Sequence, residues 1–328
     1  MTQIVAITGA TGFVGGHLLA ALLEAGYGVR VLVRNAARFE NSSDQVEIVE
    51  GDLGNVAALK QLVSGATVVI HVAGAIAGIN RRDFFLVNET GAENVAQAAV
   101  DAGVENFIHV SSLAAREPQL SHYAASKKAG EDVVSGLISN ASIVRPPAVY
   151  GPGDRATLPL IKALTQRRAI LPGRADQKIS WIYVTDLAAL LARLVETKPS
   201  ESAILEVDDG RDGGYRFADL AQLAGQAQGK TVGLTLLPRA VVSMAGWGAK
   251  LASNILRKAF ILSPEKVNEL YHPDWVVRRS KVKGWEPQVQ FQEGFKLSLE
   301  WYQQNGWLPG GQARVKSQNK SNYGDAVK

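Results

Sequence analysis

Three side chains in the stretch "VSSLAAREPQLSHYAASKKAGE" have the types and spacing for proton transfer. Tyr123 and Lys127 are four residues apart, and Ser112 ends a short apolar run just before them. On a helix, a spacing of four places both side chains on one face. Because an ammonium favours a nearby phenolate, we expect Lys127 to lower the pKa of Tyr123 from its usual value of about 10. Such a tyrosine can exchange a proton with a hydroxyl or carbonyl, while Ser112 donates a hydrogen bond to the same oxygen.

The YxxxK pattern by itself is weak support, because a chain with eight tyrosines can match it by chance. The alternative is an exposed tyrosine and a solvated lysine on a helix face. The order of the surrounding motifs favours the chemical interpretation, since a glycine-spaced turn, a basic segment and Asn88 all precede Ser112 in the chain.

The glycine-spaced turn has the context of a dinucleotide-binding fingerprint. Gly9, Gly12 and Gly15 follow an apolar run and begin a helix-like segment. In that fingerprint the first glycine permits a tight turn, the second lets the backbone approach a pyrophosphate, and the third lets the helix pack on the strand. Helix-start amides then face the phosphates. The predicted cofactor contacts of this turn are Gly9, Thr11, Gly12, Phe13, Val14 and Gly15.

Two further segments concern the choice of nucleotide. The second apolar run ends at Arg34, with Arg38 close behind and no carboxylate before Glu40, which favours NADP(H) over NAD(H). After the third run, Asp52 and Leu53 are expected beside the adenine, where the Asp52 carboxylate would accept from the exocyclic amine. The equally weighted alternative for Asp52 is a cap for the helix beginning near residue 55.

The elements that must position these residues alternate regularly. Short β-branched runs are separated by helix-like stretches, at residues 4–7, 29–33, 46–49, 68–71, 107–110 and 143–144. This rhythm predicts an α/β fold with a doubly wound parallel sheet, a Rossmann fold, over residues 1–150. Residues 151–309 are predicted to form a smaller substrate-binding lobe interleaved with it, including strands at 203–207 and 231–236. Residues 310–328 lack apolar content, and we expect disorder there.

Composition narrows the function classes. The 328 residues include no cysteine, which excludes disulfides and thiolate metal sites and favours an intracellular protein. The five histidines are scattered, so no metal site is predicted. The net charge of +4 is diffuse, and no basic run is interleaved with aromatic residues, so nucleic acid is not an expected partner. No signal peptide is evident at the start, and the expected location is the cytoplasm.

The segment 238–262 is unusually apolar and is interrupted by Lys250, Arg257 and Lys258. Its uninterrupted part is too short to cross a bilayer, which takes about 20 residues. The preferred interpretation is a helix that covers the substrate cleft or contacts another subunit. A basic amphipathic helix on a membrane surface is the less favoured alternative.

Taken together, these motifs resemble an extended short-chain dehydrogenase/reductase of the NAD-dependent epimerase/dehydratase superfamily. The resemblance runs from about residue 4 to residue 308 and includes "VNETGAENVAQAA", "RPPAVYGPGD" and "WIYVTDLAALL". It implies that Tyr123 is the general acid/base, that Lys127 holds the nicotinamide ribose, and that Ser112 polarises the substrate oxygen. Ser111 is the other candidate for the serine role.

The resemblance also implies roles around these three side chains. Asn88 would support the site through its backbone. The remaining implied cofactor contacts are Val72, Ala73 and Gly74 near the ribose, and Pro146 and Val149 at the nicotinamide. Paired helices in this family often form dimers, so a homodimer is compatible with the sequence.

Within the family, the pattern is closest to the dihydroflavonol reductase and 3β-hydroxysteroid dehydrogenase branch. Dehydration is disfavoured because Leu113, Ala114 and Ala115 follow Ser112, and no carboxylate occurs before Glu117. The resemblance therefore implies an NADP(H)-dependent alcohol dehydrogenase or carbonyl reductase acting on a small or hydrophobic substrate.

Two other functions stay open. One is a nucleotide-sugar epimerase with tightly bound NAD, in which Arg155, Arg174 and Lys178 could meet a diphosphate. The short serine-to-tyrosine segment and the basic second strand count against it. The other is a non-catalytic NADP(H)-binding subunit or sensor, against which the intact Ser112, Tyr123 and Lys127 argue.

Overall fold

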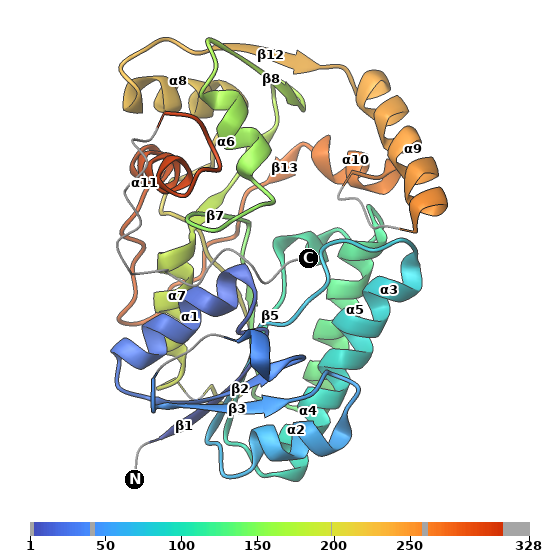
Figure 1. Ribbon diagram of the computed structural model, residues 1–328, viewed down its shortest axis with the longest axis vertical. Coiled ribbons are helices and arrows are strands. Elements are labelled where there is room, and N and C mark those ends of the chain that lie inside the picture. The colour runs from blue at the N-terminus through green and yellow to red at the C-terminus, as the bar shows by residue number, and fades with distance from the viewer. Residues whose placement is uncertain (1–2, 40–42, 198, 258–261, 311–328) are drawn as a thin grey trace.

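The computed structural model describes residues 3–39, 43–197, 199–257 and 262–310 (Figure 1). Its centre is a seven-stranded sheet in the order β11-β6-β5-β4-β1-β2-β3, in which every neighbouring pair is parallel. The strands are β1 (Ile4–Thr8), β2 (Gly28–Val33), β3 (Val46–Glu50), β4 (Val68–His71), β5 (Asn106–Val110), β6 (Ser142–Arg145) and β11 (Ala203–Glu206). The six strands predicted in the first half of the chain are confirmed.

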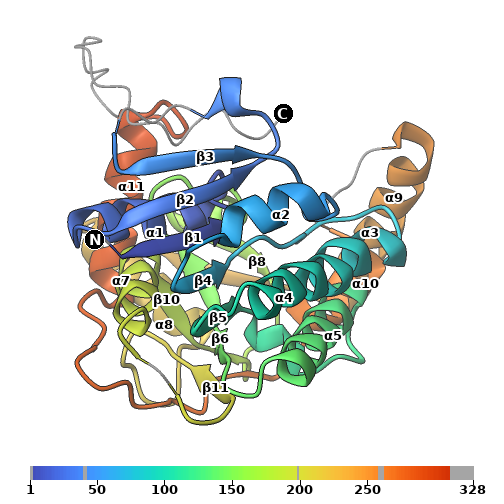
Figure 2. The same cartoon turned by 90° about the horizontal axis from the view of Figure 1, so that it is seen from below.

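Helices cover both faces of this sheet (Figure 2). Side chains alternate between the faces along each strand, so Val5 and Ile7 of β1 enter one apolar cluster and Ala6 enters the other. The first cluster is completed by α1 (Phe13–Glu24) and α7 (Val184–Leu194), and the second by α2 (Val56–Val63), α4 (Gly91–Asp101) and α5 (His122–Leu137). The predicted doubly wound Rossmann fold is thus confirmed.

The order of the strands places a crevice at their carboxyl ends. β1 pairs with β2 on one side and β4 on the other, so the chain reverses direction across the sheet at β1. In open parallel sheets, ligands bind at such a switch point. Thr8, His71 and His109 are aligned there in neighbouring strands, and the segments that follow these strands carry most of the predicted site residues.

A smaller group of elements lies beyond this edge of the sheet (Figure 1). Its aromatic core includes the buried Tyr150, Trp181, Phe291 and Tyr302. Its strands form parallel pairs β7–β10, β8–β12 and β9–β13. The elements are β7 (Ala148–Tyr150), β8 (Arg168–Pro172), β9 (Lys178–Ile179), β10 (Trp181–Tyr183), β12 (Gly233–Leu237), β13 (Asp274–Trp275), α6 (Leu158–Leu164), α8 (Phe217–Ala227), α9 (Arg239–Leu256), α10 (Pro264–Leu270) and α11 (Phe291–Gln304).

The second half of the chain contributes to both parts of the molecule. α7 packs on the sheet and β11 is its edge strand beside β6, although both follow residue 150. Nearly all of the predicted disordered tail, residues 311–328, lies outside the described residues. Within the described part of the chain, no helix combines the length and apolarity needed to cross a membrane.

Candidate active site

The glycine turn connects β1 to α1 and leaves the start of the helix open. Gly9 has a φ of +80°, and a methyl group there would lie 2.6 Å from the backbone nitrogen of Ala73. A methyl group at Gly15 would lie 2.0 Å from the carbonyl oxygen of Gly9, so this glycine lets the helix pack on the turn. Gly12 is the N-cap, with no side-chain cap and no acidic residue in the first turn.

These features fit a bound diphosphate. Thr11 and Gly12 are exposed, whereas Phe13 and Val14 are partly buried. Uncapped amides at a helix start, without a nearby negative charge on the first turn, are the donors that a pyrophosphate requires.

Arg34 and Arg38 lie at the carboxyl end of β2, and both are exposed. Arg38 belongs to a short 3-10 helix, Ala36–Arg38. The carboxylate of Glu50 also reaches this corner, because Glu50 is the last residue of the neighbouring β3. The residues that follow the second strand in sequence do not reveal it. Glu50 Oε2 accepts a hydrogen bond from the Ala36 amide at 3.1 Å. Glu50 lies at this corner because it pairs with Val33, the last residue of β2, and this pairing cannot be seen in the sequence.

Asp52 and Leu53 follow β3. Asp52 Oδ1 accepts from the Gly54 amide at 2.8 Å, whereas Asn55 caps α2 by accepting from the Ala58 amide at 3.1 Å. The alternative that Asp52 caps this helix is therefore wrong. The Leu53 side chain packs against Gly91 of α4, where an added methyl group would lie 2.7 Å from it.

Residues 72–74 continue β4 into the crevice. Thr8 Oγ1 lies 2.7 Å from His71 Nδ1 and accepts from the Ala73 amide at 3.4 Å. Val72 and Ala73 are partly buried, and Gly74 is exposed. On the other side of the crevice, Pro146 is buried and its carbonyl accepts from the Leu113 amide at 2.9 Å, while Val149 of β7 is partly buried.

Tyr123 and Ser112 meet as predicted by the motif order. Ser121 caps α5 by accepting from the Ala124 amide, which places Tyr123 in the first turn of the helix. Ser112 hydrogen-bonds to Tyr123 and accepts from the Ala114 amide at 3.2 Å. Burial raises the pKa of Tyr123, while the bond to Ser112 and the charge of Lys266 act in the opposite direction. The prediction of a lowered Tyr123 pKa is therefore wrong, because desolvation outweighs the nearby positive charge.

Lys127 lies one turn farther along α5 and is buried. Its Nζ donates to the carbonyl of Val110 at 2.9 Å and lies 3.6 Å from the position of a methyl group added at Gly74. Burial lowers the pKa of Lys127 to about 8, and the carboxylate of Glu131 opposes this change. Lys127 therefore carries its charge at neutral pH but can lose it in mildly basic solution.

Asn88 lies in a π-helical turn, Leu86–Thr90, between the short α3 (Arg81–Phe85) and α4. Its side chain exchanges two hydrogen bonds with the backbone of Ala75 and donates to Ser126 Oγ at 2.8 Å. Ser126 Oγ in turn donates to the carbonyl of Tyr123 at 2.8 Å. Asn88 thus connects the segment after β4 to the first turn of α5, and such π-turns often occur at functional sites.

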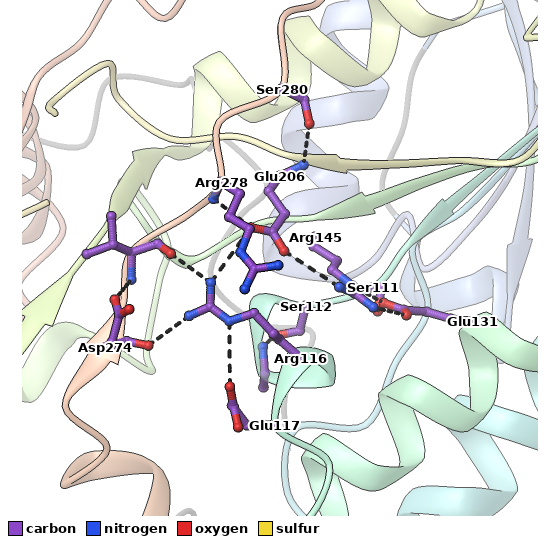
Figure 3. Close-up of polar contacts among 12 residues, drawn as sticks. Ser111, Ser112, Arg116, Glu117, Glu131, Arg145, Glu206, Asp274, Arg278 and Ser280 are labelled. Atoms are coloured by element: carbon purple, nitrogen blue, oxygen red, sulfur yellow. Dashed lines mark hydrogen bonds and ion pairs between the residues drawn. The ribbon is translucent and has the colours of Figure 1, made fainter. Parts of the chain in front are cut away.

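Ser111 faces away from this group and enters a buried ionic network (Figure 3). Its Oγ donates to Glu131 at 2.6 Å, and Glu131 also accepts two bonds from Arg145 at 2.8 and 2.6 Å. Glu206 lies 3.6 Å from Arg145 and 3.8 Å from Arg116. Because the Ser111 hydroxyl is committed to Glu131, the geometry favours Ser112 for the serine role.

Charged residues near Tyr123 and near Lys127 were missed from the sequence. Lys266 of α10 lies 5.7 Å from the centre of the Tyr123 ring and pairs with Glu269 at 2.5 Å, while Glu269 also accepts a bond from Ser121. No local pattern links α10 to the tyrosine motif, because only tertiary packing brings them together. Glu131 was also missed, although its position four residues after Lys127 is a signal in the sequence. Among the described residues, no cluster of three or more potential metal ligands occurs.

Comparisons with known proteins agree with this architecture. The model of the NAD dependent epimerase/dehydratase family matches residues 5–205. A ceramide reductase of Caulobacter vibrioides is 41% identical over 309 residues, covering 93% of this chain and 96% of that protein. A UDP-glucose 4-epimerase of Vibrio cholerae is 26% identical over 328 residues, covering 92% and 95%.

A solved structure gives the same result for the fold. MoeE5 in complex with UDP-glucose and NAD has a TM-score of 0.69 at 19% identity, covering 92% of this chain and 99% of that one. The resemblance expected from the motifs is confirmed, and with it an enzyme that uses a nicotinamide dinucleotide. The chain belongs to the NAD dependent epimerase/dehydratase family.

Proposed function

We propose that the protein is an NADP(H)-dependent carbonyl reductase, or the reverse alcohol dehydrogenase, for a ceramide-like lipid. The observation that carries this proposal is the contact of Ser112 with Tyr123 at the crevice that the glycine turn also enters. The 41% identity to a ceramide reductase across nearly the whole chain supports an amide lipid as the substrate class.

The proposed reaction assigns one proton to Tyr123. When bound, a nicotinamide dinucleotide would supply a hydride to the carbonyl carbon of the substrate. Ser112 and Tyr123 hydrogen-bond to the carbonyl oxygen, and the Tyr123 hydroxyl donates its proton to that oxygen as the C=O bond becomes an alcohol. Because burial raises the Tyr123 pKa, the hydroxyl remains protonated at neutral pH and is suited to act as the acid. The resulting phenolate regains a proton from solvent.

Lys127 and Asn88 have positioning roles in this proposal. The Lys127 ammonium lies beside Gly74 and is suited to hold a ribose hydroxyl there. Asn88 holds Ser126, which binds the carbonyl of Tyr123 and so stabilises the first turn of α5. In this proposal Lys127 therefore orients the cofactor and Asn88 orients Tyr123, and neither touches the reacting carbonyl.

The cofactor preference rests on the end of β2. Arg34 and Arg38 present two exposed guanidinium groups where a 2′-phosphate would lie. The neighbouring Glu50 is engaged with the Ala36 amide, which reduces its capacity to bind ribose hydroxyls. We therefore retain NADP(H) as the preferred cofactor.

The epimerase alternative has weaker support from the side chains. Arg174 makes two hydrogen bonds to Asp176, at 2.9 and 2.7 Å. The guanidinium of Arg155 lies over the Trp307 ring at 4.5 Å. Two of the three cations considered for a diphosphate thus already have partners. The sensor alternative does not explain why Ser112 and Tyr123 are joined in the crevice.

The test uses the purified full-length protein with a ceramide whose secondary alcohol is oxidised to a ketone. Nicotinamide fluorescence measures the affinities for NADPH and NADH, and absorbance follows NADPH consumption. Tyr123→Phe is expected to keep NADPH affinity and to lower kcat by about 100-fold or more, because the proton donor is lost. Tyr27→Phe is the control, because Tyr27 lies just before the amino-terminal end of β2, away from the crevice, and its hydroxyl donates to Glu196 at 3.5 Å.

The cofactor variant is Arg34→Ala. Loss of its charge is expected to weaken NADPH binding by about tenfold or more and to leave NADH binding unchanged. Equal losses for both cofactors would contradict the preference. NAD(H) retained through purification would favour an epimerase, and normal function in Tyr123→Phe would favour a sensor.

A further inference from the structure

The most exposed large apolar side chains of the described residues gather on α9. Met244 is 75% exposed, Ile255 is 72% exposed and Trp247 is 66% exposed, and they are followed by Leu256 and Leu251. Scattered exposed apolar residues are ordinary, but a contiguous group marks an interaction surface.

The spacing of these residues forms a single stripe. Val241, Met244, Trp247, Leu251 and Ile255 follow one another at intervals of three and four, which aligns them along one face of a helix. The opposite face is already used by the fold. Val242 packs with Val267 and Tyr271 in a small core, and Gly246 lies against the backbone of Ser263.

The charges of α9 all have one sign. The 18 residues of the helix contain no Asp or Glu. Arg239, Lys250 and the C-cap Arg257 lie within about 20° of one another around the axis, about 60–80° from Trp247 at the near edge of the stripe. Lys250 Nζ donates to the carbonyl of Ile79 at 2.6 Å, which ties α9 to the segment before α3. Arg81 and Arg82 of α3 add two positive charges to this corner, and Asp83 of the same helix adds one negative charge.

We propose that α9 docks on the surface of a membrane containing anionic lipids. In this arrangement the stripe inserts at the boundary between headgroups and acyl chains, and the basic residues approach the lipid phosphates. Trp247 has the amphipathic ring that is enriched at such interfaces. Ile76, which is 59% exposed, lies three residues before the carbonyl that Lys250 binds.

The charges favour a membrane over a second copy of the chain. A second copy of α9 would offer these basic residues no opposite charge, because each helix carries only basic titratable residues. Anionic headgroups complement this set instead. The position of α9 also suits an enzyme that acts on lipids. α10 packs against α9 and also carries Lys266, which lies beside Tyr123, so a membrane bound at α9 would be near the candidate active site. The docking proposal does not depend on the reaction proposed above.

The test is flotation of the full-length protein with vesicles of phosphatidylcholine, with or without an equal amount of phosphatidylglycerol. The first variant is Met244→Ser/Leu251→Ser/Ile255→Ser, at exposed positions of the stripe. The matched control is Val56→Ser/Ile170→Ser/Ile204→Ser, which removes exposed apolar side chains from α2, β8 and β11. Circular dichroism checks that all variants remain folded.

We expect the wild-type protein to float with the anionic vesicles, with a blue shift of tryptophan fluorescence. The stripe variant should bind at least about tenfold more weakly, and the control should bind like the wild type. Arg239→Gln/Arg257→Gln should weaken binding to anionic vesicles and reduce its dependence on salt.

Three outcomes would overturn the proposal. In the first, the wild-type protein stays in solution with both vesicle types. In the second, the stripe variant and the control bind equally well. In the third, light scattering shows a dimer that the stripe substitutions convert to a monomer, which would mean that a second copy covers this face. Loss of vesicle binding with retained turnover of a short-chain substrate would separate docking from the reaction itself.

Discussion

Replacing Gly130 by alanine should damage both the fold and the site. Gly130 lies on α5, where a methyl group would be 2.2 Å from the carbonyl oxygen of Asn88 and 3.5 Å from His109 Nε2. A carbon normally approaches an oxygen to about 3.3 Å. The helix and the π-turn must therefore separate by about 1 Å, and the obstructing atom belongs to the backbone rather than to a flexible side chain.

The magnitude follows from two opposing effects. Overpacking costs about 3 kcal/mol at the upper end of its usual range, while a glycine-to-alanine change within a helix gains about 1 kcal/mol. Gly130→Ala should therefore lower the free energy of unfolding by about 2 kcal/mol. Gly136→Ala is the matched control on the same helix, because a methyl group there meets nothing within 4 Å. It should raise the free energy of unfolding by up to about 1 kcal/mol.

Gly130→Ala should also lower activity, because it displaces α5. This helix carries Tyr123 and Lys127, and a misplacement of about 1 Å can cost on the order of 100-fold in rate. Urea unfolding gives the stabilities, and NADPH consumption gives kcat/KM. The reasoning would be refuted if Gly130→Ala were as stable as Gly136→Ala. If stability fell and kcat/KM did not, the coupling of this contact to the site would be refuted.

Two further expectations concern protonation and the serine pair. In carbonyl reduction, kcat/KM should fall above a pH of about 8, because Lys127 then loses its charge while Tyr123 stays protonated; a pH–rate profile that is level to a pH of about 9.5 would contradict this. Ser112→Ala should lower kcat about 100-fold. Ser111→Ala should keep kcat but lower the free energy of unfolding by about 1–2 kcal/mol, because it removes a buried hydrogen bond to Glu131. If instead Ser111→Ala lowered kcat and Ser112→Ala did not, Ser111 would be the catalytic serine.

Local sequence was sufficient for the features that depend on neighbouring residues. The strands at residues 68–71 and 107–110 follow from short apolar runs, and the glycine turn follows from the spacing of Gly9, Gly12 and Gly15. The helix that the glycines were expected to begin is α1, which starts at Phe13. The helix therefore starts directly after its glycine N-cap, Gly12.

Where two residues could fill the same local role, the tertiary structure was needed to choose between them. Asp52 and Asn55 are both suitable caps by residue type, and the backbone geometry assigns α2 to Asn55. Likewise, the pKa of Tyr123 could not be derived from its spacing to Lys127. The result depends on how far the phenol is buried, and desolvation of the charged form dominates in the folded protein.

The sequence by itself determined the family, the Rossmann architecture and the order of the candidate site residues, because each depends on short motifs and on the periodicity of apolar residues. Only the tertiary structure decided what surrounds them. It brought Lys266 to Tyr123, joined Ser111 to Glu131 and left the apolar stripe of α9 exposed. Contacts between residues far apart in the chain depend on how helices pack across the sheet, and no local pattern encodes that packing.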